Sequence, residues 1–117
     1  MHILIGNDNT INNRLSEELL ALFPISCLSF EVIESLKEDY QEGYIFFNLL
    51  DINVTVEQAY LLVKSKYPRK KIIGIHCFQV EQMINSILVL GFDAYISLFN
   101  FSEDVEKTLQ RITQKEI

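Results

Sequence analysis

The sequence has little of several residue types that define specialised protein classes. It contains no tryptophan, two prolines, four glycines and two cysteines among 117 residues. Two cysteines are too few for a disulfide-held scaffold. Cys27 and Cys77 both lie in apolar stretches, so we expect them to be small buried side chains in a reducing compartment.

Basic residues are also scarce. Ten lysines and arginines against sixteen aspartates and glutamates give a net charge of −6, whereas a nucleic-acid-binding surface needs a basic footprint. We expect the one basic cluster, Arg69, Lys70 and Lys71, to be a solvated turn beside a strand. No apolar run is long enough to span a bilayer, and no secretory leader pattern opens the chain. These absences predict a cytoplasmic protein without nucleic-acid or membrane partners.

Short apolar segments alternate with amphipathic ones along the chain, which predicts one domain over residues 1–117. The expected strands cover residues 3–5, 25–30, 44–50, 72–75 and 94–96. The expected helices cover residues 10–22, 32–36, 56–67, 80–90 and 103–112. The expected caps are Asn9 or Thr10 for the first helix, Thr55 with Gln58 for the third, Gly91 at the end of the fourth and Ser102 for the last.

The alternation also predicts the architecture. Near-continuous apolar strands joined by helical crossovers form a parallel sheet with helices on both faces. Right-handed crossovers give a doubly wound, flavodoxin-like α/β fold with five strands. In such a fold the functional crevice lies beyond the carboxyl ends of the strands. The residues expected there include Asn7, Asp8, Asn48, His76 and Leu98.

Two segments carry a resemblance to a known family. Residues 2–9 are similar to the first strand and following acidic pair of response-regulator receiver domains, and residues 91–99 are similar to the stretch that ends in their Lys-Pro pair. The resemblance covers essentially the whole chain and implies a role in two-component signalling or a phosphorelay. A working receiver needs carboxylates that hold Mg²⁺, an aspartate that accepts the phosphoryl group and a lysine that neutralises its charge.

The positions that match the receiver site have lost most of this chemistry. Asn7 stands at the first acidic position, Asn48 at the phosphoacceptor, His76 at the Ser/Thr position and Leu98 at the lysine, with Phe99 in place of the proline. Asp8 alone remains, which leaves at most a weak Mg²⁺ site. We therefore predict a pseudo-receiver that signals through protein contacts and is not an enzyme, with no catalytic residue, resident metal or cofactor.

A second register remains open. Asp51 follows the third expected strand and could accept a phosphoryl group, with Mg²⁺ as cofactor, in a conventional receiver. Such a receiver could form the N-terminal part of a transcriptional regulator. The Asn48 register runs without a gap from the third strand to Pro68, whereas the Asp51 register requires a deletion of three residues.

Two further side chains could act in the crevice. His76 could pair with Asp8 as an acid–base pair or a pH-sensitive contact, although a structural histidine is the favoured interpretation. Tyr95 stands at the position of the receiver aromatic that responds to phosphorylation. A buried Asn48 needs hydrogen-bond partners, and we expect Asp8 or a nearby backbone amide.

The fourth helix and the segment after the fifth strand carry more apolar residues than one packing stripe requires. Such an excess suggests a partner surface, although generous core packing is the alternative. The residues concerned are Met83, Ile87, Val89, Leu90, Phe99 and Phe101. In receivers the face formed by the fourth helix, fifth strand and last helix is a dimer or output surface. The expected partner is therefore another signalling protein or a second copy of the chain.

Overall fold

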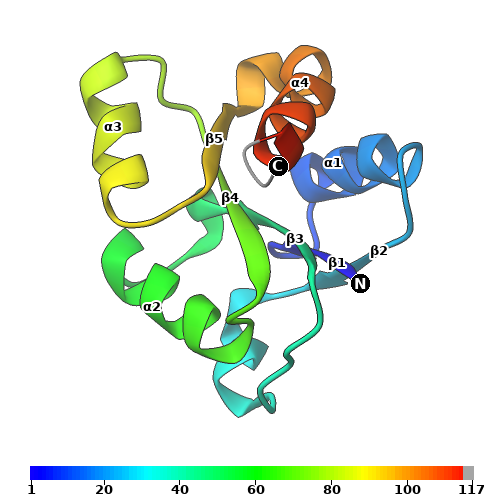
Figure 1. Ribbon diagram of the computed structural model, residues 1–117, viewed down its shortest axis with the longest axis vertical. Coiled ribbons are helices and arrows are strands. Elements are labelled where there is room, and N and C mark those ends of the chain that lie inside the picture. Colours follow the sequence, from blue (N-terminus) through cyan, green and yellow to red (C-terminus); the bar gives the residue numbers. More distant parts are fainter. Residues whose placement is uncertain (115–117) are drawn as a thin grey trace.

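The computed structural model describes residues 1–114 and places five parallel strands in one sheet (Figure 1). The strands are β1 (His2–Ile5), β2 (Ile25–Leu28), β3 (Gly43–Asn48), β4 (Lys70–His76) and β5 (Ala94–Ser97). Their order across the sheet is β2-β1-β3-β4-β5, so both edges are formed by strands that pair on one side only. The predicted doubly wound parallel sheet is confirmed.

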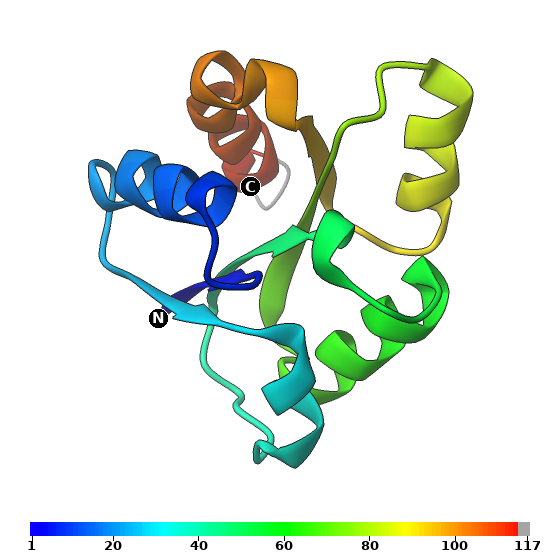
Figure 2. The ribbon, with the colours of Figure 1, turned by 180° about the vertical axis from the view of Figure 1, so that it is seen from behind.

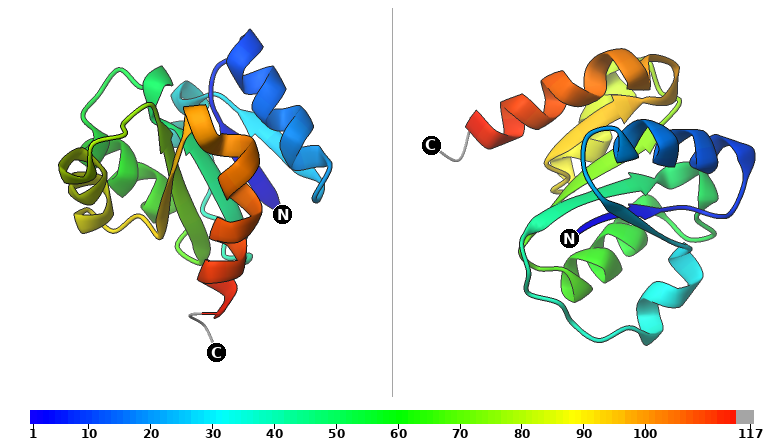
Figure 3. Two further views of the ribbon diagram at one scale, coloured as in Figure 1. Left: turned by 90° about the horizontal axis from the view of Figure 1, so that it is seen from above. Right: turned by 90° about the vertical axis from the view of Figure 1, so that its right-hand side faces the viewer.

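Helices cover both faces of this sheet (Figures 1 and 3). Within residues 1–114 the α-helices are α1 (Thr10–Leu20), α2 (Val56–Lys66), α3 (Glu81–Val89) and α4 (Phe101–Gln114). Helices α1 and α4 lie on one face, and α2 and α3 lie on the other. Short 3-10 helices follow β2, β3 and β5: η1 (Phe30–Ser35), η2 (Leu49–Asp51) and η3 (Leu98–Asn100). None of the helices in the described part of the chain is long and apolar enough to cross a membrane.

The core forms two layers because successive side chains of a strand point to opposite faces. In β3, Ile45 and Phe47 pack with α2, α3 and η1, whereas Phe46 packs with α1 and α4. Both layers are fully buried at the central strands. The carboxyl ends of β1, β3 and β4 therefore lie side by side at one end of the parallel sheet. Asn48 pairs with Ile75 between β3 and β4.

Several local signals in the sequence are confirmed. The Asn9 side chain accepts a hydrogen bond from the Asn12 backbone and caps α1. Thr55 and Gln58 form the reciprocal capping box of α2. Gly91 follows α3 with φ +123°, a conformation that favours glycine, and Tyr60 packs where a β-carbon at this position would lie.

Other expectations about elements are wrong. The expected helix over residues 32–36 is the 3-10 helix η1, which lies beside α2 (Figure 2). In η1 two side chains, Phe30 and Ile33, are buried, which is too little apolar burial to stabilise an α-helix of so few residues. Helix α1 ends at Leu20 rather than at residue 22. Ser102 lies inside α4 instead of capping it, because η3 leads directly into the helix at Phe101.

Three side chains also differ from expectation in their exposure. Cys27 and Cys77 are exposed, because Cys27 lies on the edge strand β2 and Cys77 lies in the turn after β4. Lys70 is buried in the first position of β4 rather than solvated. Its ammonium group is held by backbone carbonyl groups of the segment that precedes β3.

Candidate functional site

The crevice at the carboxyl ends of the strands contains a buried amide, Asn48, at the end of β3. Its Nδ2 donates to the Oδ1 of Asn12 over 2.7 Å. Its Oδ1 accepts from the backbone N–H of Leu50 over 3.0 Å. Both ends of the amide are therefore bound within the protein. The expected partner Asp8 is replaced by Asn12, and the expected backbone amide is that of Leu50.

Asn12 is the crevice residue that the sequence pattern did not mark as a partner of Asn48. It lies on α1 and is 4% exposed. Its Nδ2 donates to the Asn7 carbonyl oxygen over 2.7 Å and to Oδ2 of Asp51 over 2.6 Å. A signal was present in the sequence: Asn12 stands three residues before Leu15 and seven before Leu19, in the buried stripe of the helix.

Asp51 brings its carboxylate into the crevice from η2. Oδ2 of Asp51 accepts from the backbone N–H of Asn7 over 2.9 Å as well as from the Asn12 amide. Four residues, Asn7, Asn12, Asn48 and Asp51, thus form one hydrogen-bonded network that links the β1–α1 connection, α1, β3 and η2. We call it the crevice network. It carries one negative charge, on a residue that follows the end of β3 by three positions.

His76 ends β4 but does not meet Asp8. Its Nδ1 accepts from the backbone N–H of Cys77 over 2.8 Å, and its ring stacks on Phe78 with 3.9 Å between the ring centroids. Burial lowers the pKa of His76 below its usual value. Asp8 is exposed, and no hydrogen bond or ion pair joins it to His76 in the described part of the chain. The geometry shows no acid–base pair here.

Tyr95 is anchored to the connection that follows β4. Its hydroxyl group donates toward the carbonyl oxygens of Phe78 and His76, at 2.8 Å and 2.9 Å. Burial raises the pKa of Tyr95. The ring therefore helps to position the backbone around His76.

The position after β5 is apolar in structure as well as in sequence. Leu98 is half-buried and packs against the core between the sheet, α1 and α4. The Ser97 hydroxyl accepts from the backbone N–H of Phe99 and holds the turn. Among residues 1–114, no group of three or more His, Cys, Asp and Glu side chains is placed to hold a metal ion.

The residues of the expected interaction surface differ in exposure: some are exposed and others are buried. Val89, Phe99 and Met83 are 85%, 68% and 43% exposed. Ile87 and Phe101 are each 2% exposed and belong to the two core layers, so their inclusion in a surface was wrong. Leu90 is half-buried and packs against the core layer formed with α2 and α3. Both buried side chains face the sheet, and this explains part of the apolar excess.

The strand order β2-β1-β3-β4-β5, with helices on both faces and a polar crevice at the strand ends, is the receiver fold of response regulators. A LuxR-family DNA-binding response regulator from Staphylococcus aureus aligns with a TM-score of 0.64 and 16% identity, over 95% of this chain and 97% of that one. RcsB from Salmonella enterica serovar Typhimurium, solved on promoter rprA DNA with the phosphomimetic BeF3⁻, aligns at 0.69 and 14%, over 95% and 67%.

A third solved structure, a putative pilus assembly protein (cpaE) from Burkholderia thailandensis, aligns with a TM-score of 0.67 and 7% identity, over 97% of this chain and 98% of that one. No family model matches the sequence, and no curated protein matches it significantly. At identities this low the likeness concerns the fold, so the chemistry of this crevice is argued from its own residues.

Proposed function

We propose that the chain is a cytoplasmic pseudo-receiver: a signalling module that acts through protein–protein contacts, does not depend on aspartate phosphorylation and is not an enzyme. The observation that carries this proposal is the buried Asn48 amide, bound at both ends by Asn12 and Leu50. The receiver fold of the solved response regulators supports a role in two-component signalling.

The chemistry of the crevice argues against phosphoryl transfer at Asn48. An amide oxygen is far less nucleophilic than a carboxylate, and that of Asn48 already accepts a hydrogen bond. Leu98 offers no positive charge to a transferring phosphoryl group, where preorganised charge is the main source of stabilisation. Asp8 is the one carboxylate at the receiver positions, and a single carboxylate with two amides is a poor Mg²⁺ site.

The direct test is incubation with acetyl phosphate and Mg²⁺, followed by intact-protein mass spectrometry. We expect no phosphorylated species, while an active receiver domain treated in parallel becomes labelled. Beryllofluoride with Mg²⁺ should leave the amide NMR spectrum of the crevice residues unchanged. A stoichiometric phosphoryl adduct would contradict the proposal.

A second candidate function is a receiver that accepts phosphate at Asp51. The observation that favours it is the position of this carboxylate, bound by the Asn7 backbone N–H inside the crevice. The same bonds weigh against it, because both donors reduce the nucleophilicity of Oδ2. Peptide mass spectrometry after acetyl phosphate treatment separates the two: phosphate on Asp51 that is lost in Asp51→Asn would establish this candidate.

A further inference from the structure

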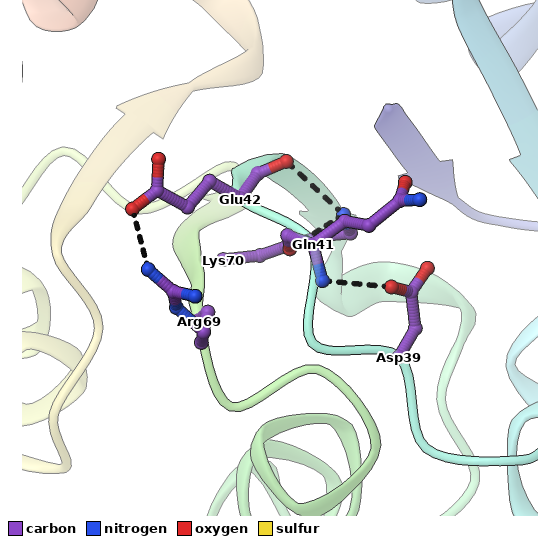
Figure 4. A network of polar contacts seen from close by, with 5 residues as sticks. All are labelled: Asp39, Gln41, Glu42, Arg69 and Lys70. Atoms are coloured by element: carbon purple, nitrogen blue, oxygen red, sulfur yellow. Dashed lines mark hydrogen bonds and ion pairs between the residues drawn. The ribbon is translucent and has the colours of Figure 1, made fainter.

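A pocket lies at the amino ends of the strands, opposite the crevice, where β3 and β4 begin. It is a cavity of about 380 Å³, within the size range of small-molecule sites. Its lining residues are Glu42, Gly43, Tyr44, Lys64, Pro68, Arg69, Lys70, Lys71 and Asp93. Figure 4 shows the contacts that two of these residues, Arg69 and Lys70, make with the segment from Gln41 to Glu42.

The pocket is positively charged, whereas the protein as a whole is negatively charged. Four of the ten basic residues line it, namely Lys64, Arg69, Lys70 and Lys71, together with two acidic residues. The pocket therefore carries an excess of two positive charges on a chain whose net charge is −6. A concave site lined by one sign of charge concentrates ligands of the other sign.

The two carboxylates of the pocket already have partners. Glu42 pairs with Arg69 over 2.9 Å, and both side chains are largely exposed. Oδ2 of Asp93 accepts from the backbone N–H of Ile72 over 2.8 Å. An exposed ion pair of this kind contributes little to stability, so an incoming anion can displace Glu42 from the guanidinium group with little loss.

Lys70 supplies a buried positive charge among the basic residues of the pocket. It is 1% exposed, and its Nζ donates to the carbonyl oxygens of Gln41 and Glu42 over 3.0 Å and 3.3 Å. Within residues 1–114 no carboxylate lies within 4.0 Å of this nitrogen. A buried charge is normally paired, and an ammonium group has a third N–H to donate. The Lys70 ammonium group also lies over the Tyr67 ring, 5.8 Å from the ring centroid. With no carboxylate of the described residues close to it, this charge adds to the positive potential of the pocket that Lys70 lines.

We propose that this pocket binds a small phosphate-bearing polyanion. Several cations within one cavity match a ligand with more than one negative charge, and a guanidinium group binds phosphate oxygens in a bidentate manner. In the bound state Arg69 exchanges Glu42 for a phosphate group, and Lys64 and Lys71 contribute further charge from the rim. The site is independent of the crevice network, at the other ends of the strands.

The test is isothermal titration calorimetry with pyrophosphate as the probe. We expect binding to the wild-type protein and weakening on the order of tenfold in Arg69→Gln and in Lys64→Gln, each of which loses one charge-assisted contact. Lys107→Gln, which removes the same charge from the exposed side of α4, is the matched control and should change the affinity less than about twofold. Glu42→Gln should tighten binding, because it removes the internal competitor for Arg69.

Three results would overturn the proposal. The first is no binding at millimolar pyrophosphate in wild type and in Glu42→Gln. The second is equal weakening in Arg69→Gln and Lys107→Gln, which would show a general charge effect. The third is citrate bound as tightly as pyrophosphate, which would exclude a phosphate site. Unchanged urea midpoints in the variants confirm that the affinities refer to folded protein.

Discussion

At the scale of single residues, the crevice network is a set of satisfied hydrogen bonds. The Asn48 amide donates to the Asn12 side-chain oxygen, and the Asn12 amide donates in turn to the Asp51 carboxylate. Among residues 1–114 every buried side-chain nitrogen and oxygen atom has a partner. Complete satisfaction makes such a network stabilising and sensitive to a change at any member.

Asn48→Asp tests this sensitivity. The new carboxylate loses the donor that now bonds to Asn12, and it adds a second charge to a network that contains Asp51. We expect destabilisation of about 1 to 3 kcal/mol at neutral pH. Burial and the Asp51 charge raise the pKa of the new carboxyl, so the loss grows as pH rises through that value and is small below about pH 4. Urea unfolding at several pH values measures it.

The same variant should not be phosphorylated by acetyl phosphate, because Asn7 and Leu98 still lack the charges of a working receiver. Asn48→Ser is the control: it introduces no charge, so its stability should not depend on pH in the same way. A labelled Asn48→Asp protein would show that one residue had blocked the chemistry.

The two histidines predict a second pH dependence. Burial lowers the pKa of His76; burial, the N-terminal ammonium group and Lys70 lower the pKa of His2. A lowered pKa means that the unfolded chain binds protons first, so the free energy of unfolding falls as pH decreases below about 6.5. Urea midpoints should therefore decrease between pH 7.5 and 5.5. His76→Gln and His2→Gln should each reduce that decrease; identical slopes in all three proteins would contradict the assignment.

At the scale of elements, the capping box of α2 gives a clear prediction. The Thr55 hydroxyl accepts from the Gln58 backbone N–H, and the Gln58 side chain accepts from the Thr55 backbone N–H. Thr55→Ala should destabilise the protein by about 1 kcal/mol. Thr55→Ser keeps the oxygen and should lose much less. Chemical denaturation of the three proteins measures the difference, and equal losses in both variants would assign the effect to the methyl group.

The features that could be predicted from the sequence are those that depend on residues close together in the chain. The capping box, Gly91 and the strand periods depend on neighbours in the chain, and they were visible in the sequence. Lys70 and Asn12 depend on partners 28 to 39 positions away, so their burial followed only from tertiary packing. The expected helix at 32–36 failed for a related reason, since how much of its apolar surface is buried depends on packing against α2.

At the scale of the whole molecule, the exposed apolar residues of α3 suggest how the module meets a partner. Val89 is nearly fully exposed, and Met83 is also accessible on the same helix. Helix α3 packs against β5, an edge strand, and α4 packs against the other face of the same strand. A second copy of the chain is the simplest partner to test.

Sedimentation velocity over a range of concentrations tests self-association. We expect a reversible dimer, and we expect Val89→Lys to raise its dissociation constant on the order of tenfold, since a buried lysine at an interface loses hydration without a partner. Leu61→Lys is the control, because Leu61 is also an exposed apolar residue but lies on α2. A strict monomer at high concentration, or equal weakening by the two variants, would remove the α3 face as a dimer surface.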